Sequence, residues 1–247
     1  MVHLVKIAQP KILADNADKW TKEYLNCIAQ DIKPGKTLAT AYNKPEIKKA
    51  LEEETHGKCA YCESKVKHIS PGDIEHILPK NKNARPDLCF AWDNLTFACE
   101  DCNRSGKHDY YEPDLPLINP YVDYPENHFK AFGPMVQEKL GDSRAYATRA
   151  TLDLNRTPLM EKRVERIESV KTLFTVWITR AESDPLKKIL ENELHKEYGK
   201  DKEFSFVIKY YLDGMGFPVV NESIQNGGIL YEYPRLYTSS DGYGIQF

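Results

Sequence analysis

Two pairs of cysteines have the spacing of metal ligands. Cys59 and Cys62 lie in "KCAYCE", and Cys99 and Cys102 lie in "ACEDCN". A gap of two residues lets both thiolates of a pair bind one ion, and two such pairs supply the four sulfur ligands of a tetrahedral zinc site. Such a site is structural, because it leaves no position open for a substrate. The alternative, two unrelated pairs of which one is redox-active, lacks the βαβ pattern that usually accompanies a redox pair.

An acidic residue and a histidine stand side by side in "GDIEHILPK", which lies between the two cysteine pairs. Glu75 could bind a hard divalent cation such as Mg²⁺ or Mn²⁺. His76, with an ordinary pKa of about 6.5, could deprotonate a water molecule near neutral pH. Hydrolysis of a phosphodiester needs both, since a cation stabilises the negative charge that develops on the phosphorane and the leaving 3′-oxygen. Taken alone, Glu75 and His76 would more often be an ordinary polar pair on the surface.

The residues around this pair predict two short strands and a helix. Pro71 and Gly72 favour a turn, and a strand over residues 73–78 would follow it and end at Pro79. The stretch "WDNLTFACEDCNRSGK" predicts a second strand over 95–97 and a helix that begins near Asp101. Zinc bound by the four cysteines would fix the junction between strand and helix.

This order of motifs resembles the HNH, or ββα-metal, endonucleases, especially those in which two CxxC pairs bracket the site. The matching parts are "CAYC", "DIEHILPK", "DNL" and "CEDCNRSGK". The resemblance implies that His76 is the general base and that Glu75 binds the catalytic cation. It also implies that Asn94 steadies the loop of the base and that Asn103 is the second metal ligand. Many members carry "DHH" where this chain has "DIEH", so Asp73 could compete with Glu75 as the ligand.

Three basic residues near these positions are candidate contacts to substrate phosphates. They are Lys80, which ends the "DIEHILPK" motif, and Arg104 and Lys107, which follow the second cysteine pair. For the last two, solvated helix charges are an equally good interpretation.

A closer resemblance extends over about residues 45–170. Besides the nuclease motifs, "LINPYVDYPENHF" and "ATLDLNR" resemble the PtuB-like HNH subunits of Septu-type and retron-associated anti-phage systems. Membership of this family implies a PtuA-like ATPase partner and a role in defence against phage. The substrate implied first is DNA. RNA, such as a tRNA, is an alternative, and a zinc-stabilised module that binds nucleic acid or protein without catalysis is another.

The composition is that of an ordinary globular protein. The 247 residues are 41% hydrophobic and 29% charged, with a net charge of −3, which argues against binding of nucleic acid by bulk electrostatics. No apolar run approaches the roughly 20 residues of a membrane span, and the first residues lack the apolar core of a secretory leader. We therefore expect a cytoplasmic protein with reduced cysteines and no membrane association.

The expected fold class is α+β, with a zinc-stapled ββα-metal core flanked by helices. Residues 1–57 are predicted to form N-terminal helices, with helical spacing over 13–28 and a helix opened by Pro45. Residues 58–110 would be the nuclease core, and 111–145 a proline-rich connector with a hairpin about Gly133. Residues 146–247 would be a C-terminal helical region and tail. Within it, Asp184 and Pro185 start a helix whose inward-facing residues are Leu186, Ile189, Leu190 and Leu194.

Overall fold

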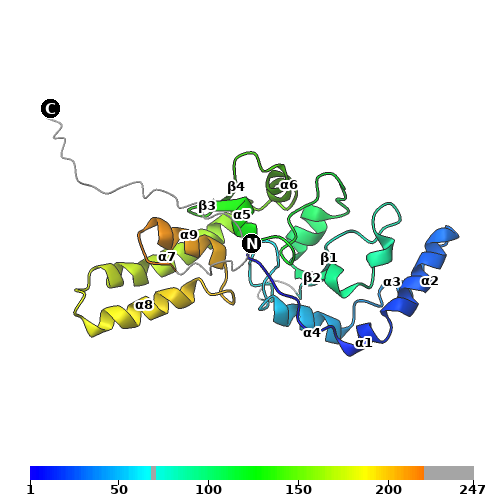
Figure 1. The fold of residues 1–247 in the computed structure, drawn as a ribbon, viewed down its shortest axis with the longest axis horizontal. Coiled ribbons are helices and arrows are strands. Elements are labelled where there is room, and N and C mark those ends of the chain that lie inside the picture. The colour runs from blue at the N-terminus through cyan, green and yellow to red at the C-terminus, as the bar shows by residue number, and fades with distance from the viewer. Residues whose placement is uncertain (68–70, 220–247) are drawn as a thin grey trace, which may run out of the picture.

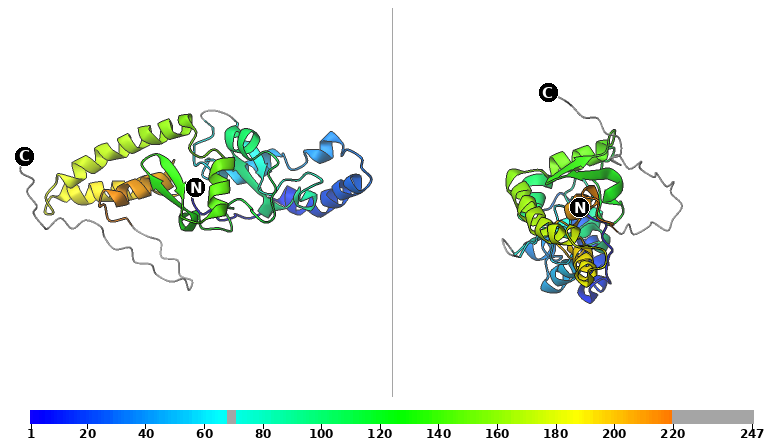
Figure 2. Two further views of the ribbon diagram at one scale, coloured as in Figure 1. Left: turned by 90° about the horizontal axis from the view of Figure 1, so that it is seen from above. Right: turned by 90° about the vertical axis from the view of Figure 1, so that its left-hand side faces the viewer.

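The computed structural model describes residues 1–67 and 71–219, and it combines helices with two small antiparallel sheets (Figure 1). The tail from residue 220, part of the predicted C-terminal region, lies outside the described residues. The left view in Figure 2 shows an elongated molecule, with the helices of residues 11–39 at one end and those of residues 157–197 at the other. The sheet formed by residues 73–76 and 95–98 lies between these ends. No helix among the described residues is long and apolar enough to cross a membrane.

Four helices precede the central sheet. They are α1 (Lys11–Ala14), α2 (Ala17–Ala29), α3 (Lys36–Ala39) and α4 (Pro45–Glu54). Pro45 occupies the first turn of α4, as predicted, where its missing N–H costs no hydrogen bond. The helical spacing over 13–28 is divided between α1 and α2 at Asn16, whose side-chain amide donates to the Ile12 carbonyl at 2.8 Å. Such side-chain bonds to the backbone compete with continuation of a helix.

The N-terminal segment fastens α4 to the central sheet. Lys6 Nζ donates to Glu54 Oε1 at 2.9 Å and also to the Leu95 carbonyl. The Tyr121 hydroxyl donates to the same Glu54 oxygen at 2.6 Å and lies 2.7 Å from the Thr96 hydroxyl. Because Glu54 is buried, these partners supply the bonds that its carboxylate would otherwise make to water.

The central sheet consists of β1 (Asp73–His76) and β2 (Leu95–Ala98), which pair antiparallel with Asp73 opposite Ala98 and His76 opposite Leu95. Two 3₁₀ turns lie between the strands, at Pro86–Leu88 (η1) and Trp92–Asn94 (η2). The strand predicted over 73–78 ends at His76, because the side chain of Asn94 forms hydrogen bonds with both the N–H and the carbonyl of Leu78. The helix predicted from Asp101 is a π-helical segment, Asp101–Lys107 (η3).

Gly72 is required at the entrance to β1. Its φ of +68° lies in the left-handed region, and a Cβ added there would lie 2.3 Å from Cζ of Phe97 on the neighbouring strand. The ring of Phe97 is fully buried against this backbone. Gly72, predicted to form a turn with Pro71, therefore also packs closely against β2.

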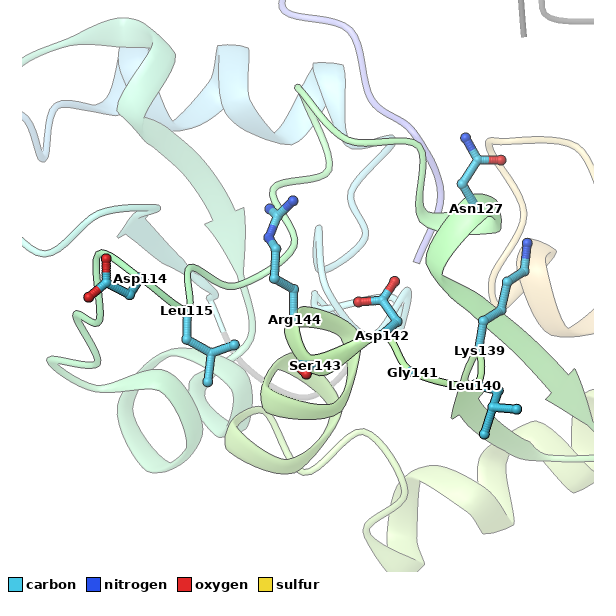
Figure 3. Close-up of a pocket in the computed structure, with 9 residues that line it drawn as sticks. All are labelled: Asp114, Leu115, Asn127, Lys139, Leu140, Gly141, Asp142, Ser143 and Arg144. Carbon is cyan, nitrogen blue, oxygen red and sulfur yellow. The ribbon is translucent and has the colours of Figure 1, made fainter. Parts of the chain in front are cut away.

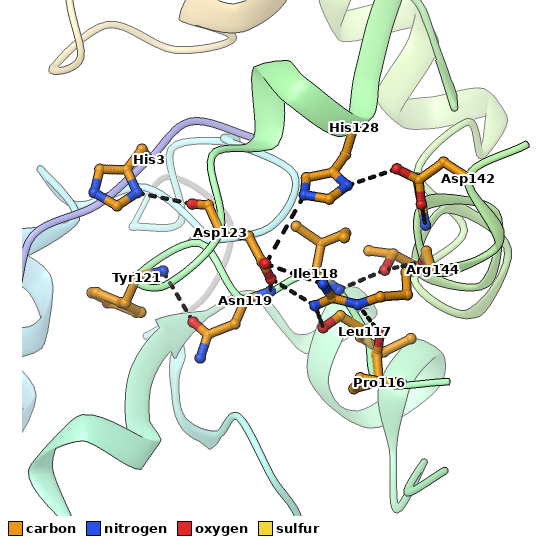
Figure 4. Close-up of polar contacts among 12 residues, drawn as sticks. His3, Pro116, Leu117, Ile118, Asn119, Tyr121, Asp123, His128, Asp142 and Arg144 are labelled. Atoms are coloured by element: carbon orange, nitrogen blue, oxygen red, sulfur yellow. Dashed lines mark hydrogen bonds and ion pairs between the residues drawn. The ribbon is translucent and has the colours of Figure 1, made fainter. Parts of the chain in front are cut away.

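The connector after η3 leads to α5 (Pro125–His128) and to a hairpin of β3 (Phe129–Phe132) and β4 (Met135–Glu138). The hairpin predicted about Gly133 is confirmed, with Phe129 opposite Glu138 and Phe132 opposite Met135. Polar side chains fasten the connector to the next helix (Figure 4). Arg144 binds both carboxylate oxygens of Asp123 and the carbonyls of Pro116 and Leu117.

The region from Ser143 to Gly214 is mostly helical, as predicted. It contains α6 (Ser143–Thr151), α7 (Thr157–Ile178), α8 (Pro185–Glu197) and α9 (Ser205–Gly214). Helix α8 begins at Asp184, whose side chain accepts from the Leu186 N–H at 2.9 Å. The inward orientation predicted for Leu194 is confirmed, since this residue is fully buried, but that predicted for Leu186 and Ile189 is wrong, because they are 37% and 57% exposed. Only the last turns of α8 pack into the core, so apolar spacing along the helix overstates its buried face.

Candidate active site

The four cysteines predicted as zinc ligands come together. Their sulfur atoms all lie within 4.8 Å of one another, and those of Cys62 and Cys99 are 3.7 Å apart. Tetrahedral zinc with Zn–S bonds of about 2.3 Å requires sulfur atoms roughly 3.8 Å apart, so the cluster fits this ion. Within the part of the chain that the structure describes, it is the one group of three or more His, Cys, Asp or Glu ligands close enough to share a metal.

Arg156, a residue that the sequence analysis did not single out, lies against this cluster. Its guanidinium nitrogens are 3.8–3.9 Å from the sulfurs of Cys62, Cys99 and Cys102, and one is 3.2 Å from Asp101 Oδ2. Burial alone would lower the pKa of Arg156, but the charges of the nearby cysteine sulfurs outweigh it and raise that pKa. Four thiolates around Zn²⁺ carry a net charge of −2, and Arg156 offsets part of it. The residue directly precedes α7, so it also joins the cluster to the C-terminal helices.

His76 is buried with one ring nitrogen fixed by the backbone. Nε2 lies 2.9 Å from the Cys89 carbonyl, and since a carbonyl can only accept, Nε2 carries the proton and Nδ1 presents a lone pair. Burial, reinforced by the charge of Lys80, lowers the pKa of His76 to about 3. The imidazole is thus neutral at physiological pH, and it is a weaker base in this state than the ordinary histidine pKa suggests.

Asn94 holds the loop that follows β1. Its side-chain oxygen accepts from the Leu78 N–H at 2.8 Å, and its amide donates to the carbonyls of Leu78 and Leu88 at 2.9 and 3.2 Å. Its own carbonyl accepts from the Ile77 N–H at 2.8 Å. Asn94 therefore connects the end of β1 to the segment that carries the Cys89 carbonyl, the partner of His76.

Glu75 is paired with a lysine in the interior. Lys107 Nζ lies 2.7 Å from Glu75 Oε1, and the two residues are only 3% and 4% exposed. Burial raises the pKa of Glu75, and the charge of Lys107 opposes that rise. Lys107, predicted as a phosphate contact, thus occupies an oxygen of the carboxylate predicted to bind the cation.

Asp73 and Asn103, the other predicted cation ligands, are in direct contact. Asn103 Nδ2 donates to Asp73 Oδ2 at 3.1 Å, and Arg104 forms a bidentate pair with the same carboxylate, with both bonds at 2.9 Å. Asp73 and Glu75 lie two residues apart on β1, so their side chains point to the same face of the sheet. The structure therefore places Asp73 next to Asn103, and it pairs each of the two carboxylates with a cationic side chain.

Lys80 is connected to His76 by Tyr42, a second residue that the sequence analysis missed. Its Nζ donates to the hydroxyl of Tyr42 at 2.5 Å and lies 3.8 Å from the centre of that ring. The ring of Tyr42 in turn meets His76 edge to face, with centroids 4.5 Å apart. No motif in the sequence connects Tyr42 with the site, because it lies between α3 and α4, 34 residues before His76.

An open hollow of about 550 Å³ lies away from these residues, at the start of α6 (Figure 3). Its lining is mostly polar and includes Asp142, Ser143 and Arg144, with Leu140 fully exposed at its edge. Asp142 accepts from the Ala145 N–H as the cap of α6, and His128 lies 2.7 Å from its carboxylate (Figure 4). The polar side chains Asp142 and Arg144 are thus engaged in holding the connector and α6 together.

Comparison with known proteins identifies the central segment. Residues 59–109 match the family model described as HNH endonuclease. The chain carries an HNH endonuclease domain. This HNH domain contains the four cysteines and all the predicted site residues, whereas Tyr42 and Arg156 lie outside it.

Three bacterial proteins are similar to a larger part of the chain. The chain is 34% identical to Septu protein PtuB of Bacillus thuringiensis over 180 residues, which is 70% of this chain and 64% of the relative. It is 28% identical to a second Septu protein PtuB, from Bacillus mycoides, covering 60% of this chain and 64% of that protein. A candidate HNH endonuclease of retron Vc95 from Vibrio cholerae is 25% identical over 69% of this chain and 84% of its own length. The chain thus spans a little under two thirds of both PtuB proteins. No solved structure matches it significantly.

Proposed function

We propose that the protein is a metal-dependent endonuclease that hydrolyses phosphodiester bonds, with DNA as its substrate. In this proposal His76 is the general base and Asn94 braces it. Glu75, Asp73 and Asn103 supply the oxygen ligands of a Mg²⁺ or Mn²⁺ ion. A hard cation prefers carboxylate and amide oxygens, and Asp73 and Glu75 on one face of β1, with Asn103 in contact with Asp73, fit that preference.

The observation that carries the proposal is the bond between His76 and the Cys89 carbonyl. Because Nε2 donates at 2.9 Å, Nδ1 is held as the proton acceptor. The pKa of about 3 keeps His76 neutral at pH 7, so it can accept a proton without first losing one. An approaching phosphate would raise this pKa, since a negative charge favours the imidazolium. His76 would then remove a proton from water as the water oxygen bonds to phosphorus and the 3′-oxygen leaves.

A bound divalent cation would supply Lewis acidity at the phosphate. In the structure Lys107 and Arg104 are bonded to the carboxylates that would bind this cation. Lys107 is buried, so we assign it to the positioning of Glu75 rather than to a direct phosphate contact. Arg104 is well exposed and Lys80 lies next to His76, so both stay candidate phosphate contacts.

The test is cleavage of supercoiled plasmid with Mg²⁺ or Mn²⁺ by the wild type and by His76→Ala. Loss of a general base should lower the rate about 10²- to 10⁴-fold, with zinc content and melting temperature retained. His195→Ala on α8 is the matched control and should cleave like the wild type. A His76→Ala variant as active as the wild type would refute the assignment of the base.

The relatives' names motivate the finer parts of the proposal. Two are called Septu protein PtuB and one is assigned to a retron, so we propose that this protein is the nuclease subunit of an anti-phage complex with a PtuA-like ATPase in the cytoplasm. Parallel assays on plasmid DNA and on tRNA decide the substrate, and cleavage restricted to tRNA would replace DNA by RNA. Co-purification with the product of the adjacent gene tests the ATPase partner.

A further inference from the structure

Tyr42 reaches the predicted active site from outside the HNH domain. It follows α3 in the N-terminal helical segment, whereas the family match begins at residue 59. Its ring packs edge to face on His76 at 4.5 Å between centroids, and its hydroxyl accepts from Lys80 at 2.5 Å. A single side chain thus contacts both the proposed base and a candidate phosphate-binding cation.

Because the Tyr42 oxygen accepts the hydrogen bond from Lys80, the hydroxyl proton of Tyr42 remains available for a hydrogen bond of its own. An ammonium has donors only, so the phenol oxygen must be the acceptor in this contact. Burial, together with nearby acidic groups that include Glu75 and Asp73, raises the pKa of Tyr42 to about 12, so the hydroxyl keeps its proton at physiological pH. Among the described residues, the hydrogen bond shown for the Tyr42 hydroxyl is the one that it accepts from Lys80.

Two donors beside a neutral base form a binding site for an anionic oxygen. The Lys80 ammonium donates to the Tyr42 oxygen, so the two donor groups lie side by side. Both groups are close enough to Glu75 for its negative charge to act on their pKa values. The carboxylates of Glu75 and Asp73 are paired with Lys107 and Arg104 instead.

We propose that Tyr42 is a catalytic residue of the nuclease, whose hydroxyl donates a hydrogen bond to a non-bridging oxygen of the scissile phosphate. Lys80 contacts the same phosphate and orients the phenol. The inference rests on the proposed function, and it gives the N-terminal helices a role in catalysis, since they deliver Tyr42 to the HNH domain. The competing interpretation is that the Tyr42 ring is only a wall against which His76 packs.

The experiment uses the full chain and supercoiled plasmid with Mn²⁺, and compares Tyr42→Phe, Tyr42→Ala and His76→Ala. Tyr42→Phe keeps the ring on His76 and removes only the hydroxyl. A hydrogen bond to a charged oxygen is worth a factor of about 10 to 100 in kcat/KM, and we expect that loss in Tyr42→Phe. Tyr42→Ala should lose more, because it also removes the ring. The matched control is Tyr210→Phe on α9, whose hydroxyl donates to the Phe129 carbonyl at 3.2 Å, and it should cleave normally.

Two further measurements separate the hydroxyl's role from a structural one. The melting temperature and the Mn²⁺ concentration for half-maximal activity should be unchanged in Tyr42→Phe, because the phenol is not a proposed ligand of the cation. Full activity in Tyr42→Phe, with His76→Ala inactive, would overturn this inference and leave the proposed function standing. The inference would also be overturned if the melting temperature of Tyr42→Phe fell far enough for unfolding to account for its whole loss of activity. Activity in His76→Ala would instead refute the proposed function.

Discussion

Replacing Lys107 by methionine tests the buried pair on which the proposed cation site depends. The ammonium and the Glu75 carboxylate are 2.7 Å apart, and both residues are almost completely shielded from water. Lys107→Met would leave a carboxylate in the interior without its countercharge. Removal of one partner from such a pair costs about 3–5 kcal/mol. For a chain of this size, that corresponds to a fall in melting temperature of roughly 6–20 °C.

The loss of stability should depend on pH. Burial raises the pKa of Glu75 and Lys107 opposes that rise, so the pKa in the folded variant should lie further above its value in the unfolded chain. The folded state then binds a proton that the unfolded state releases, and stability falls as pH rises between the two pKa values. The variant should therefore approach the wild type near pH 4–5 and differ most from it at neutral pH and above.

The assay is thermal unfolding by circular dichroism in zinc-containing buffer, with and without Mn²⁺. Glu75→Gln/Lys107→Met removes both charges and should recover most of the loss. Lys171→Met, which breaks the exposed pair with Glu168, is the matched control and should cost at most about 1 kcal/mol.

The cation provides a second criterion. If Glu75 binds it, Mn²⁺ should raise the melting temperature of Lys107→Met more than that of the wild type, because the ion replaces the missing charge. A variant that melts within 2 °C of the wild type at neutral pH would refute the reasoning about the pair. If Mn²⁺ raised the melting temperature of Lys107→Met no more than that of the wild type, Glu75 would no longer be a proposed ligand.

Two other features make separate predictions. Arg156→Gln should lose zinc to a chelator about 10- to 100-fold faster than the wild type, whereas Arg149→Gln, whose partner Glu138 is remote from the sulfurs, should not; equal rates would mean that Arg156 does not stabilise the cluster. Gly72→Ala should destabilise the fold by about 2–4 kcal/mol, since it combines left-handed strain with a clash on Phe97. Gly133→Ala shares the positive φ but has no neighbour within 4 Å, so it should cost only about 1 kcal/mol; similar denaturation midpoints for the two variants would contradict the packing argument.

The local parts of the site could be predicted because their chemistry is encoded by residues close in sequence. The two CxxC pairs predicted a four-sulfur cluster, and their sulfur atoms do converge. The turn at Pro71 and Gly72 predicted the start of β1, and Pro45 and Asp184 predicted the starts of α4 and α8. Each of these depends on backbone geometry that a few adjacent residues determine.

The charge partners could not be predicted in the same way. Lys107 was expected to face substrate phosphates, yet it is buried against Glu75. Likewise, the apolar spacing of Leu186 and Ile189 predicts a buried face that the first turns of α8 do not have. A side chain's burial depends on which distant segment packs over it, and periodicity within a single helix does not contain that information.

The sequence by itself determined the four cysteines of the sulfur cluster and the starts of β1 and α4, because metal coordination and turn geometry require particular residues at short spacing. Only the tertiary structure decided that Tyr42 lies on His76, that Arg156 lies on the sulfur cluster and that Lys107 neutralises Glu75. Tyr42 and Arg156 reach their partners over 34 and 54 or more residues of intervening chain. Electrostatic and packing energies depend on distance in space, so the fold had to bring these groups together before their roles could be inferred.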